Sequence, residues 1–168
     1  MIPDESVTAP AREKWESWKP ALAACLAATK GSVLEIGVGH YSTHWLHDLC
    51  QAEGRTLFSF EEDKEWYEAV SALRTVGHYI FNDTYDKLLH EHAYGEYSVV
   101  FMDHSPGPRR GRDLLLFLGN AEYVVIHDFH KEVEEAVRAF MPAHCKIAVT
   151  PLDPPTAILS LRREMPPL

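Results

Sequence analysis

The chain has 168 residues, of which 46% are hydrophobic and 24% are charged, as in one ordinary globular domain. This balance excludes a disordered, collagen-like or disulfide-stapled chain. Sixteen basic and twenty-five acidic side chains give a net charge of −9. Nucleic acid is therefore not an expected partner, because binding a phosphate backbone requires clustered Lys and Arg.

No apolar run is long enough to span a membrane, and residues 1–14 lack the apolar core of a signal peptide. We therefore expect no membrane partner and a cytoplasmic location. The three cysteines are an odd number and lie far apart, at Cys25, Cys50 and Cys145. This spacing predicts buried free thiols rather than disulfides.

Residues 1–30 are expected to form an N-terminal helical lid or brace, with Pro20 in the first turn of a helix over 21–29. After it, short apolar runs alternate with amphipathic stretches through a single core domain, 31–168. Strands are predicted at 32–36, 56–60, 78–81, 97–102, 123–127, 146–150 and 156–162, and helices at 42–52, 64–76, 85–92, 113–118 and 131–141.

Repeated strand–helix alternation predicts a parallel sheet with helices on both faces. The last two strands are joined by a proline-rich segment, 151–155, that leaves no room for a helix, so the last strand should be antiparallel. A mostly parallel sheet of seven strands with the last one reversed resembles the layout of class I S-adenosylmethionine-dependent methyltransferases, a Rossmann-like α/β fold.

The turn after the first strand carries two closely spaced glycines and reads Glu35-Ile36-Gly37-Val38-Gly39-His40-Tyr41-Ser42. Such glycines let the backbone turn tightly and approach a ligand. Ser42 replaces the third glycine of a dinucleotide fingerprint and is expected to cap the next helix. S-adenosylmethionine, which carries no phosphate, therefore fits better than a pyrophosphate cofactor. Contacts with it are predicted for Glu35, Gly37, Gly39, His40 and Ser42.

The second and third strand ends offer groups for the nucleoside. Glu61 is placed to accept hydrogen bonds from a ribose diol, with Glu62 as the nearest alternative. Alternatively, the acids at 61–63 only favour the start of a helix. Asn82 and Asp83 follow the third strand and are candidates for an adenine amino group, whereas Asp103 follows the fourth.

The motifs also resemble the plant glucuronoxylan 4-O-methyltransferase group over residues 32–141. The likeness rests on Glu35-x-Gly37-x-Gly39-His40, on Glu61-Glu62-Asp63 with Trp66, on Asp103-x-x-Pro106-Gly107 with Arg109 and Arg112, and on Val125-Ile126-His127-Asp128 with Lys131, Val133 and Glu134. The sequence departs from that group at Tyr41, where the group has Asp. The resemblance implies methyl transfer to an oxygen of a saccharide.

Asp103, His127, Asp128 and His130 should meet at the carboxyl edge of the sheet, where ligands of such folds collect. We predict that they remove the proton of the acceptor in an in-line methyl transfer. Alternatively, Asp103, Asp128 and His130 hold a divalent metal ion. Small catechol-type O-methyltransferases, which bind a metal, are similar at Asp103 and Asp128, but Phe129 stands where they have Asn.

Residues 105–112 form a basic cluster in an acidic protein, with two glycines and two prolines that are expected to keep it out of the following helix. Arg109 or Arg112, together with His104, is predicted to bind an anionic group of the substrate. The alternative is that these arginines neutralise nearby acids, including Asp113.

These patterns together predict an S-adenosylmethionine-dependent methyltransferase that modifies an oxygen of a small or carbohydrate-like acceptor, which carries an anionic group if the arginines face it. Two alternatives are an NAD-linked oxidoreductase and a cofactor-binding module that has lost its activity.

Overall fold

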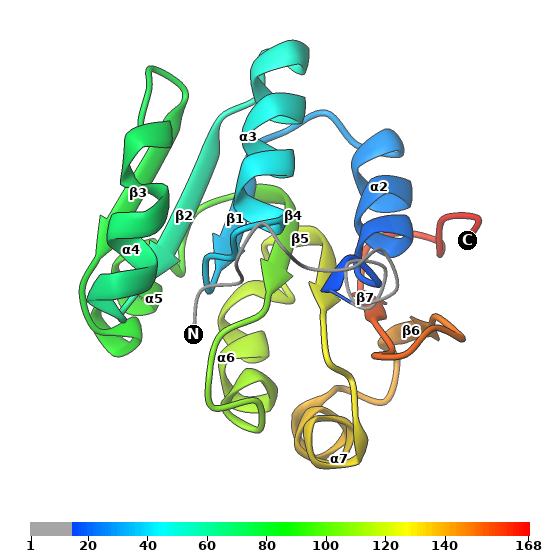
Figure 1. Cartoon of the computed structure of the whole chain (residues 1–168). Helices are drawn as coiled ribbons and strands as arrows, with labels where there is room; N and C mark the ends of the chain where they lie inside the picture. The colour runs from blue at the N-terminus through cyan, green and yellow to red at the C-terminus, as the bar shows by residue number, and fades with distance from the viewer. Residues whose placement is uncertain (1–14) are drawn as a thin grey trace.

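A computed structural model describes residues 15–168 as one sheet between two groups of helices (Figure 1). The strands are β1 Val33–Ile36, β2 Leu57–Glu61, β3 His78–Asn82, β4 Tyr97–Met102, β5 Ala121–Ile126, β6 Lys146–Val149 and β7 Ala157–Ser160. The helices are α2 Lys19–Ala27, α3 Ser42–Glu53, α4 Lys64–Val70, α5 Tyr85–His92, α6 Arg109–Phe117 and α7 Lys131–Phe140, with a 3-10 turn at Ser71–Leu73.

The sheet has seven strands in the order β3-β2-β1-β4-β5-β7-β6. Strand β7 is antiparallel to both of its neighbours, and the pairings among β1 to β5 are parallel. The predicted sheet and its reversed last strand are therefore confirmed. The order changes direction between β1 and β4, which leaves a crevice at their carboxyl ends where ligands of α/β folds bind.

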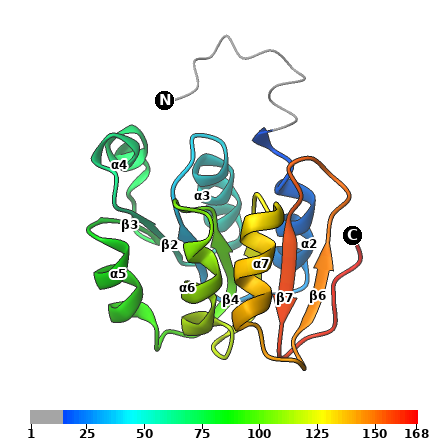
Figure 2. The same ribbon diagram turned by 90° about the horizontal axis from the view of Figure 1, so that it is seen from below.

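Helices α2, α3 and α4 cover one face of the sheet, and α5, α6 and α7 cover the other (Figure 2). The central strands β1 and β4 are buried along their whole length, because helices shield both of their faces. A large apolar cluster around Phe60, Met102 and Phe117 fills one side, and a second cluster around Leu22, Leu46 and Phe101 fills the other.

Three local predictions are wrong. The helix predicted over 64–76 ends at Val70 and is followed by the 3-10 turn. Helix α6 begins at Arg109 rather than Asp113, because Pro108 suits a helix start and Gly111 fits against α7, where a Cβ atom would lie 2.5 Å from the Ala136 carbonyl oxygen. Ser42 does not cap α3. It is the first residue of that helix, and its hydroxyl donates to Glu35 Oε1 at 2.8 Å.

The predicted lid lies partly outside the described residues, which include only 15–30 of it. Within that part, Pro20 stands in the first turn of α2, as predicted. The three cysteines are free and buried, as expected. Among the described residues, no helix combines the length and the apolar character that crossing a bilayer requires.

Candidate cofactor and acceptor site

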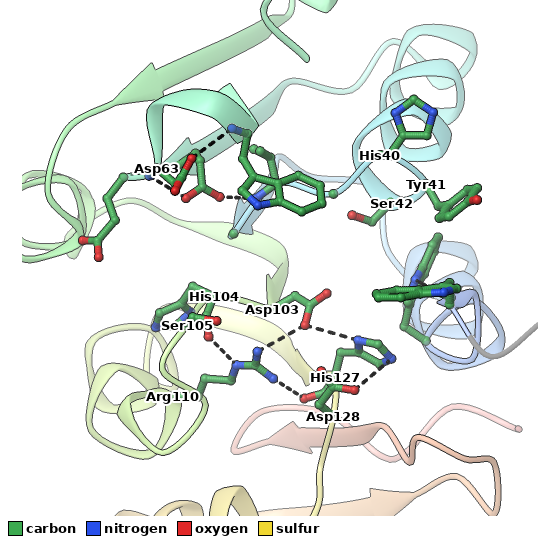
Figure 3. A pocket seen from close by; sticks show the side chains of 18 of the residues that line it. His40, Tyr41, Ser42, Asp63, Asp103, His104, Ser105, Arg110, His127 and Asp128 are labelled. Carbon is green, nitrogen blue, oxygen red and sulfur yellow. Dashed lines mark hydrogen bonds and ion pairs between the residues drawn. The ribbon is translucent and has the colours of Figure 1, made fainter. Parts of the chain in front are cut away.

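A cavity of about 770 Å³ lies at the carboxyl ends of β1, β2, β4 and β5 (Figure 3). This volume is within the range of about 300–1,000 Å³ that is typical of small-molecule sites. Its walls come from four strand ends and the segments after them, from α3, α4, α5 and α6, from the segment before α2 and from the segment between β6 and β7. The lining residues are Trp15, Trp18, Gly37, Val38, Gly39, His40, Tyr41, Ser42, Glu61, Glu62, Asp63, Trp66, Tyr85, Asp103, His104, Ser105, Arg110, His127, Asp128 and Pro154.

The glycine turn forms one wall, and Glu35 holds it from below. Glu35 is completely buried and accepts hydrogen bonds from the hydroxyls of Ser42, Thr43 and Ser59 at 2.7 to 3.0 Å. Burial raises the pKa of Glu35 to about 7. Glu35 does not line the cavity, whereas Gly37, Gly39, His40 and Ser42 do. Glu35 can therefore act on a ligand through the shape of the turn.

Glu61 lies at the end of β2, beside the glycine turn. Its carboxylate accepts from Val38 N at 3.0 Å, from Asp63 N at 2.9 Å and from the Tyr85 hydroxyl at 3.0 Å. Burial raises its pKa above the usual value, and these hydrogen bonds oppose that shift. The side chain is thus held in a fixed orientation on the cavity wall, as a group that recognises a diol must be.

Asp103, His127 and Ser17 form a hydrogen-bonded chain at the other end of the cavity. Asp103 Oδ1 lies 3.2 Å from His127 Nδ1, and the Ser17 hydroxyl lies 3.1 Å from His127 Nε2. Burial alone would lower the pKa of His127, but Asp103 and Asp128 outweigh it and hold this pKa above the usual value. When the N–H group at Nδ1 donates to Asp103, neutral His127 carries its lone pair on Nε2.

Asp128 completes this group. It follows His127 and has a φ of +49°, a backbone conformation that few residues other than glycine adopt. Its Oδ1 lies 3.7 Å from His127 Nε2, and its side chain is 44% exposed, so the carboxylate is available to a ligand.

Arg110 supplies a buried positive charge beside these acids. From α6 its guanidinium donates to the carbonyl oxygens of His104 at 2.8 Å and His127 at 2.6 Å, and it lies 3.2 Å from Asp103 Oδ1. It therefore joins the ends of β4 and β5 and fixes one oxygen of Asp103 (Figure 3).

The predicted metal ligands Asp103, Asp128 and His130 do not come together as a set. Ligand atoms of Asp103, His127 and Asp128 lie within 4.8 Å of one another, and His130 is exposed at the start of α7 and outside this group. An ion on Asp103 would lie beside the guanidinium of Arg110, which is 3.2 Å from Asp103 Oδ1. Like charges about 4 Å apart repel strongly in a poorly solvated site. The residues therefore do not fit a divalent ion.

Arg109 and Arg112 point away from the cavity. Each guanidinium contacts Asp86 and Asp113, so these two arginines neutralise acids, as the alternative predicted. Burial acts to raise the pKa of Asp113, but hydrogen bonds from His104, Arg109 and Arg112 hold it below its usual value. Burial also lowers the pKa of His104, which lines the cavity.

The residues predicted to hold adenine do not line this cavity either. Asn82 donates to the carbonyl oxygen of Glu61 at 2.9 Å, and Asp83 pairs with Lys87 on the first turn of α5. Glu62 does line the cavity and accepts from Tyr85 N at 3.0 Å.

Comparisons with known proteins support the fold described above. No family model and no curated protein sequence matches the chain. The chain is similar to the S-adenosylhomocysteine-bound methyltransferase PaMTH1 of Podospora anserina, with a TM-score of 0.68 and 11% identity, over 97% of this chain and 99% of that one. Human methyltransferase-like protein 13, also in complex with S-adenosylhomocysteine, has a TM-score of 0.69 and 14% identity over 91% and 85% of the two chains. CalS11, a TDP-rhamnose 3'-O-methyltransferase of calicheamicin biosynthesis, gives 0.64 and 13% over 92% and 81%.

The chain has the class I methyltransferase fold. Within this fold, the sequence predictions that the cavity brings together are Gly37, Gly39, His40, Ser42, Glu61, Glu62, Asp103, His104, His127 and Asp128. Sequence reasoning missed Ser17, Tyr85, Arg110 and the tryptophans Trp15, Trp18 and Trp66. Trp66 entered only as part of a motif. The spacing of Tyr85, Leu88 and Leu89 was a usable signal for Tyr85, because α5 has the predicted bounds. Arg110 could be found only with the correct start of α6.

Proposed function

We propose that this protein transfers the methyl group of S-adenosylmethionine to a hydroxyl oxygen of a small or carbohydrate-like acceptor. One observation carries the proposal. A single cavity holds the glycine turn and Glu61 on one side and the group of Asp103, His127 and Asp128 on the other. A donor and an acceptor bound at these two ends would meet at the end of β4.

The lining favours a positively charged cofactor. Five carboxylates line the cavity, at Glu61, Glu62, Asp63, Asp103 and Asp128, against one guanidinium among the described residues, that of Arg110. S-adenosylmethionine carries a net positive charge at its sulfonium centre, so this field stabilises it. Glu61 would accept from the ribose hydroxyls. The glycine turn, which packs on the end of β4 at Gly37 and on Ser42 at Gly39, would border the amino-acid end.

When bound, S-adenosylmethionine supplies an electrophilic methyl group on sulfur. The protein must then orient the acceptor oxygen and remove its proton. We assign proton removal to His127 Nε2, because Asp103 on Nδ1 and Asp128 near Nε2 stabilise the imidazolium that forms. The Ser17 hydroxyl occupies this nitrogen at 3.1 Å, so the hydroxyl of the acceptor would have to take its place there. Arg110 keeps Asp103 in place throughout.

The acceptor end is aromatic rather than basic. Trp15, Trp18 and Tyr41 line it, and the N–H groups of Arg110 already serve Asp103 and two carbonyl oxygens. A neutral acceptor with a ring, such as a sugar or a phenol, can pack on these side chains. Arg109 and Arg112 pair with Asp86 and Asp113, so the acceptor is not expected to carry an anionic group for them. The resemblance to glucuronoxylan 4-O-methyltransferases remains a prediction from the motif residues.

Ligand-induced shifts in melting temperature test the cofactor. S-adenosylhomocysteine in hundredfold excess over its Kd should stabilise the protein by about 2.7 kcal/mol, and NADH should not. Stabilisation by NADH alone would support the oxidoreductase alternative instead.

Incubation with methyl-labelled S-adenosylmethionine and a panel of sugars and phenols then tests transfer. Label in a methyl ether is the expected result. Tight cofactor binding without any transfer would instead support the inactive binding module.

A further inference from the structure

A chain of hydrogen bonds links Glu35, beneath the glycine turn, to the surface of α3. The Ser59 hydroxyl lies 2.7 Å from Glu35 Oε2 and 3.0 Å from His78 Nε2. On the other side of the His78 ring, Nδ1 lies 2.9 Å from His47 Nδ1. His47 is half-buried on α3, so this end of the chain reaches solvent. We call Ser59, His78 and His47 the relay.

His78 is the central link of the relay. It is 1% exposed, and each of its ring nitrogens contacts one of the two neighbouring links. Burial, together with the nearby His47, lowers the pKa of His78 to about 4. Its ring is therefore neutral at neutral pH, with one N–H group and one lone pair. Because two ring nitrogens in contact share one hydrogen, the tautomer of His78 fixes that of neutral His47.

Two arrangements of hydrogen satisfy every bond of the relay. When Glu35 is ionised, Ser59 donates to its Oε2, and His78 Nε2–H donates to Ser59. His47 Nδ1–H then donates to His78 Nδ1. When Glu35 carries a proton on Oε2, every bond is reversed, and His78 Nδ1–H donates to His47. A proton that arrives at His47 Nε2 converts the first arrangement into the second, because each link passes on one hydrogen and Glu35 gains the last one.

The groups around Glu35 favour such an exchange. Among the described residues, the titratable groups that interact with it from neighbouring elements are Asp103, at the end of β4, and Cys50, on α3. Burial raises the pKa of Cys50 to about 11, so its thiol stays neutral. Burial raises the pKa of Glu35 most and Asp103 adds to the shift, whereas its three hydroxyl partners oppose it. The balance is a pKa of about 7, so Glu35 exchanges a proton near neutral pH.

Glu35 connects the relay to the glycine turn. Its Oε1 accepts from the hydroxyls of Ser42 and Thr43 at 2.8 and 3.0 Å. Thr43 Oγ1 in turn accepts from Gly39 N at 2.9 Å. An ionised carboxylate is a stronger acceptor than a protonated one, so the turn is held more firmly when Glu35 is ionised.

We propose that the relay carries a proton between solvent and Glu35, and that the charge beneath the glycine turn thereby follows the pH. Ser59, His78 and His47 are positioning residues, because they act on the turn through Glu35. The effect on the cofactor rests on the proposed function. Ionised Glu35 both holds the turn and attracts the positive charge of S-adenosylmethionine, so this ligand binds more tightly as the pH rises.

Nitrogen NMR of the imidazole rings tests the relay in the free protein. The carbon signal of the Glu35 carboxyl shows the pH at which this group gains its proton. As the pH falls through that point, the hydrogen of His78 should move from Nε2 to Nδ1, and that of His47 from Nδ1 to Nε2. If His78 keeps one tautomer while Glu35 titrates, the relay is overturned.

Three variants identify the group that drives the change of tautomer. Glu35→Gln mimics the protonated state and should hold neutral His78 in the Nδ1–H tautomer at every pH. Ser59→Ala interrupts the relay and should abolish the change while Glu35 still titrates. Ser160→Ala is the matched control, because Ser160 is equally buried but lies on β7 and donates to the Glu122 carbonyl oxygen, and it should behave as the wild type. A change of tautomer that persists in Glu35→Gln or in Ser59→Ala would refute the proposal.

Calorimetry tests the effect on the cofactor. The Kd of S-adenosylmethionine should fall as the pH rises through the titration of Glu35, by about tenfold if binding lowers this pKa by one unit. His127 and the cavity carboxylates also respond to pH, so the comparison is with Glu35→Gln, in which this part of the dependence should be lost. Equal dependence in the two proteins would overturn the link to the cofactor. If S-adenosylmethionine does not bind the wild type at any pH, the proposed function itself fails, and the tautomers still decide the relay.

Discussion

Gly37 combines a positive φ with close contact to the backbone at the end of β4. Its φ is +87°, and a Cβ atom there would lie 2.6 Å from His104 N and 2.7 Å from both Asp103 C and His104 Cα. Gly37→Ala should therefore lose about 1–2 kcal/mol from the left-handed backbone and about 1–3 kcal/mol from overlap with a buried strand end. The total of about 2–5 kcal/mol is a large part of a typical stability of about 5–15 kcal/mol.

Gly54 offers a matched control, because it also has a positive φ, of +65°, but no atom within 4 Å of an added Cβ. Gly54→Ala should lose only the backbone contribution, about 1–2 kcal/mol, and should bind S-adenosylhomocysteine as the wild type does. Urea unfolding and calorimetry measure both quantities. If Gly37→Ala proves as stable as Gly54→Ala and retains cofactor affinity, the close approach of the glycine turn to β4 is not what the site depends on.

Three further predictions address the chemistry. Glu61→Gln should weaken S-adenosylhomocysteine binding by about 1.5–3 kcal/mol, because a charged acceptor for the ribose is lost, and unchanged calorimetric affinity would remove Glu61 from the cofactor site. The rate kcat/KM should rise with pH through the raised pKa of His127, because only the neutral imidazole takes a proton. In Asp103→Asn this inflection should move to lower pH, and an inflection that stays in place would contradict the assigned base. Methyl transfer should persist in EDTA, because Arg110 already provides the positive charge beside Asp103. Activity that is lost in EDTA and returns only with added Mg²⁺ or Mn²⁺ would contradict the exclusion of a metal ion.

The architecture was predictable because its signals are periodic. Buried strands such as Val33–Ile36 and Tyr97–Met102 read as almost wholly apolar runs, and the prolines at 151–155 exclude a crossover helix before the last strand. Once the strands were predicted, their carboxyl ends were known as well. The residues at those ends, Gly37, Glu61, Asp103 and Asp128, could therefore be predicted to line the site.

The roles of the arginines were not predictable in the same way. Which of Arg109, Arg110 and Arg112 faces the cavity depends on where α6 begins, and one turn of helix changes the answer. The expectation that α6 begins at Asp113 left all three in a loop and favoured the two that the structure turns toward Asp86. Trp18 lines the cavity and Ser17 contacts His127 through long-range packing, for which a single sequence carries no periodic signal.

Helices α6 and α7 pack so closely at Gly111 that a substitution there can affect the cavity. At Gly111 an added Cβ would lie 2.5 Å from the Ala136 carbonyl carbon and oxygen, so any larger side chain must push the two helices apart. Arg110 is the preceding residue, and its guanidinium would be carried away from Asp103 by that displacement. A substitution at Gly111, which does not line the cavity, would then disturb the proposed acceptor end as much as a substitution within it.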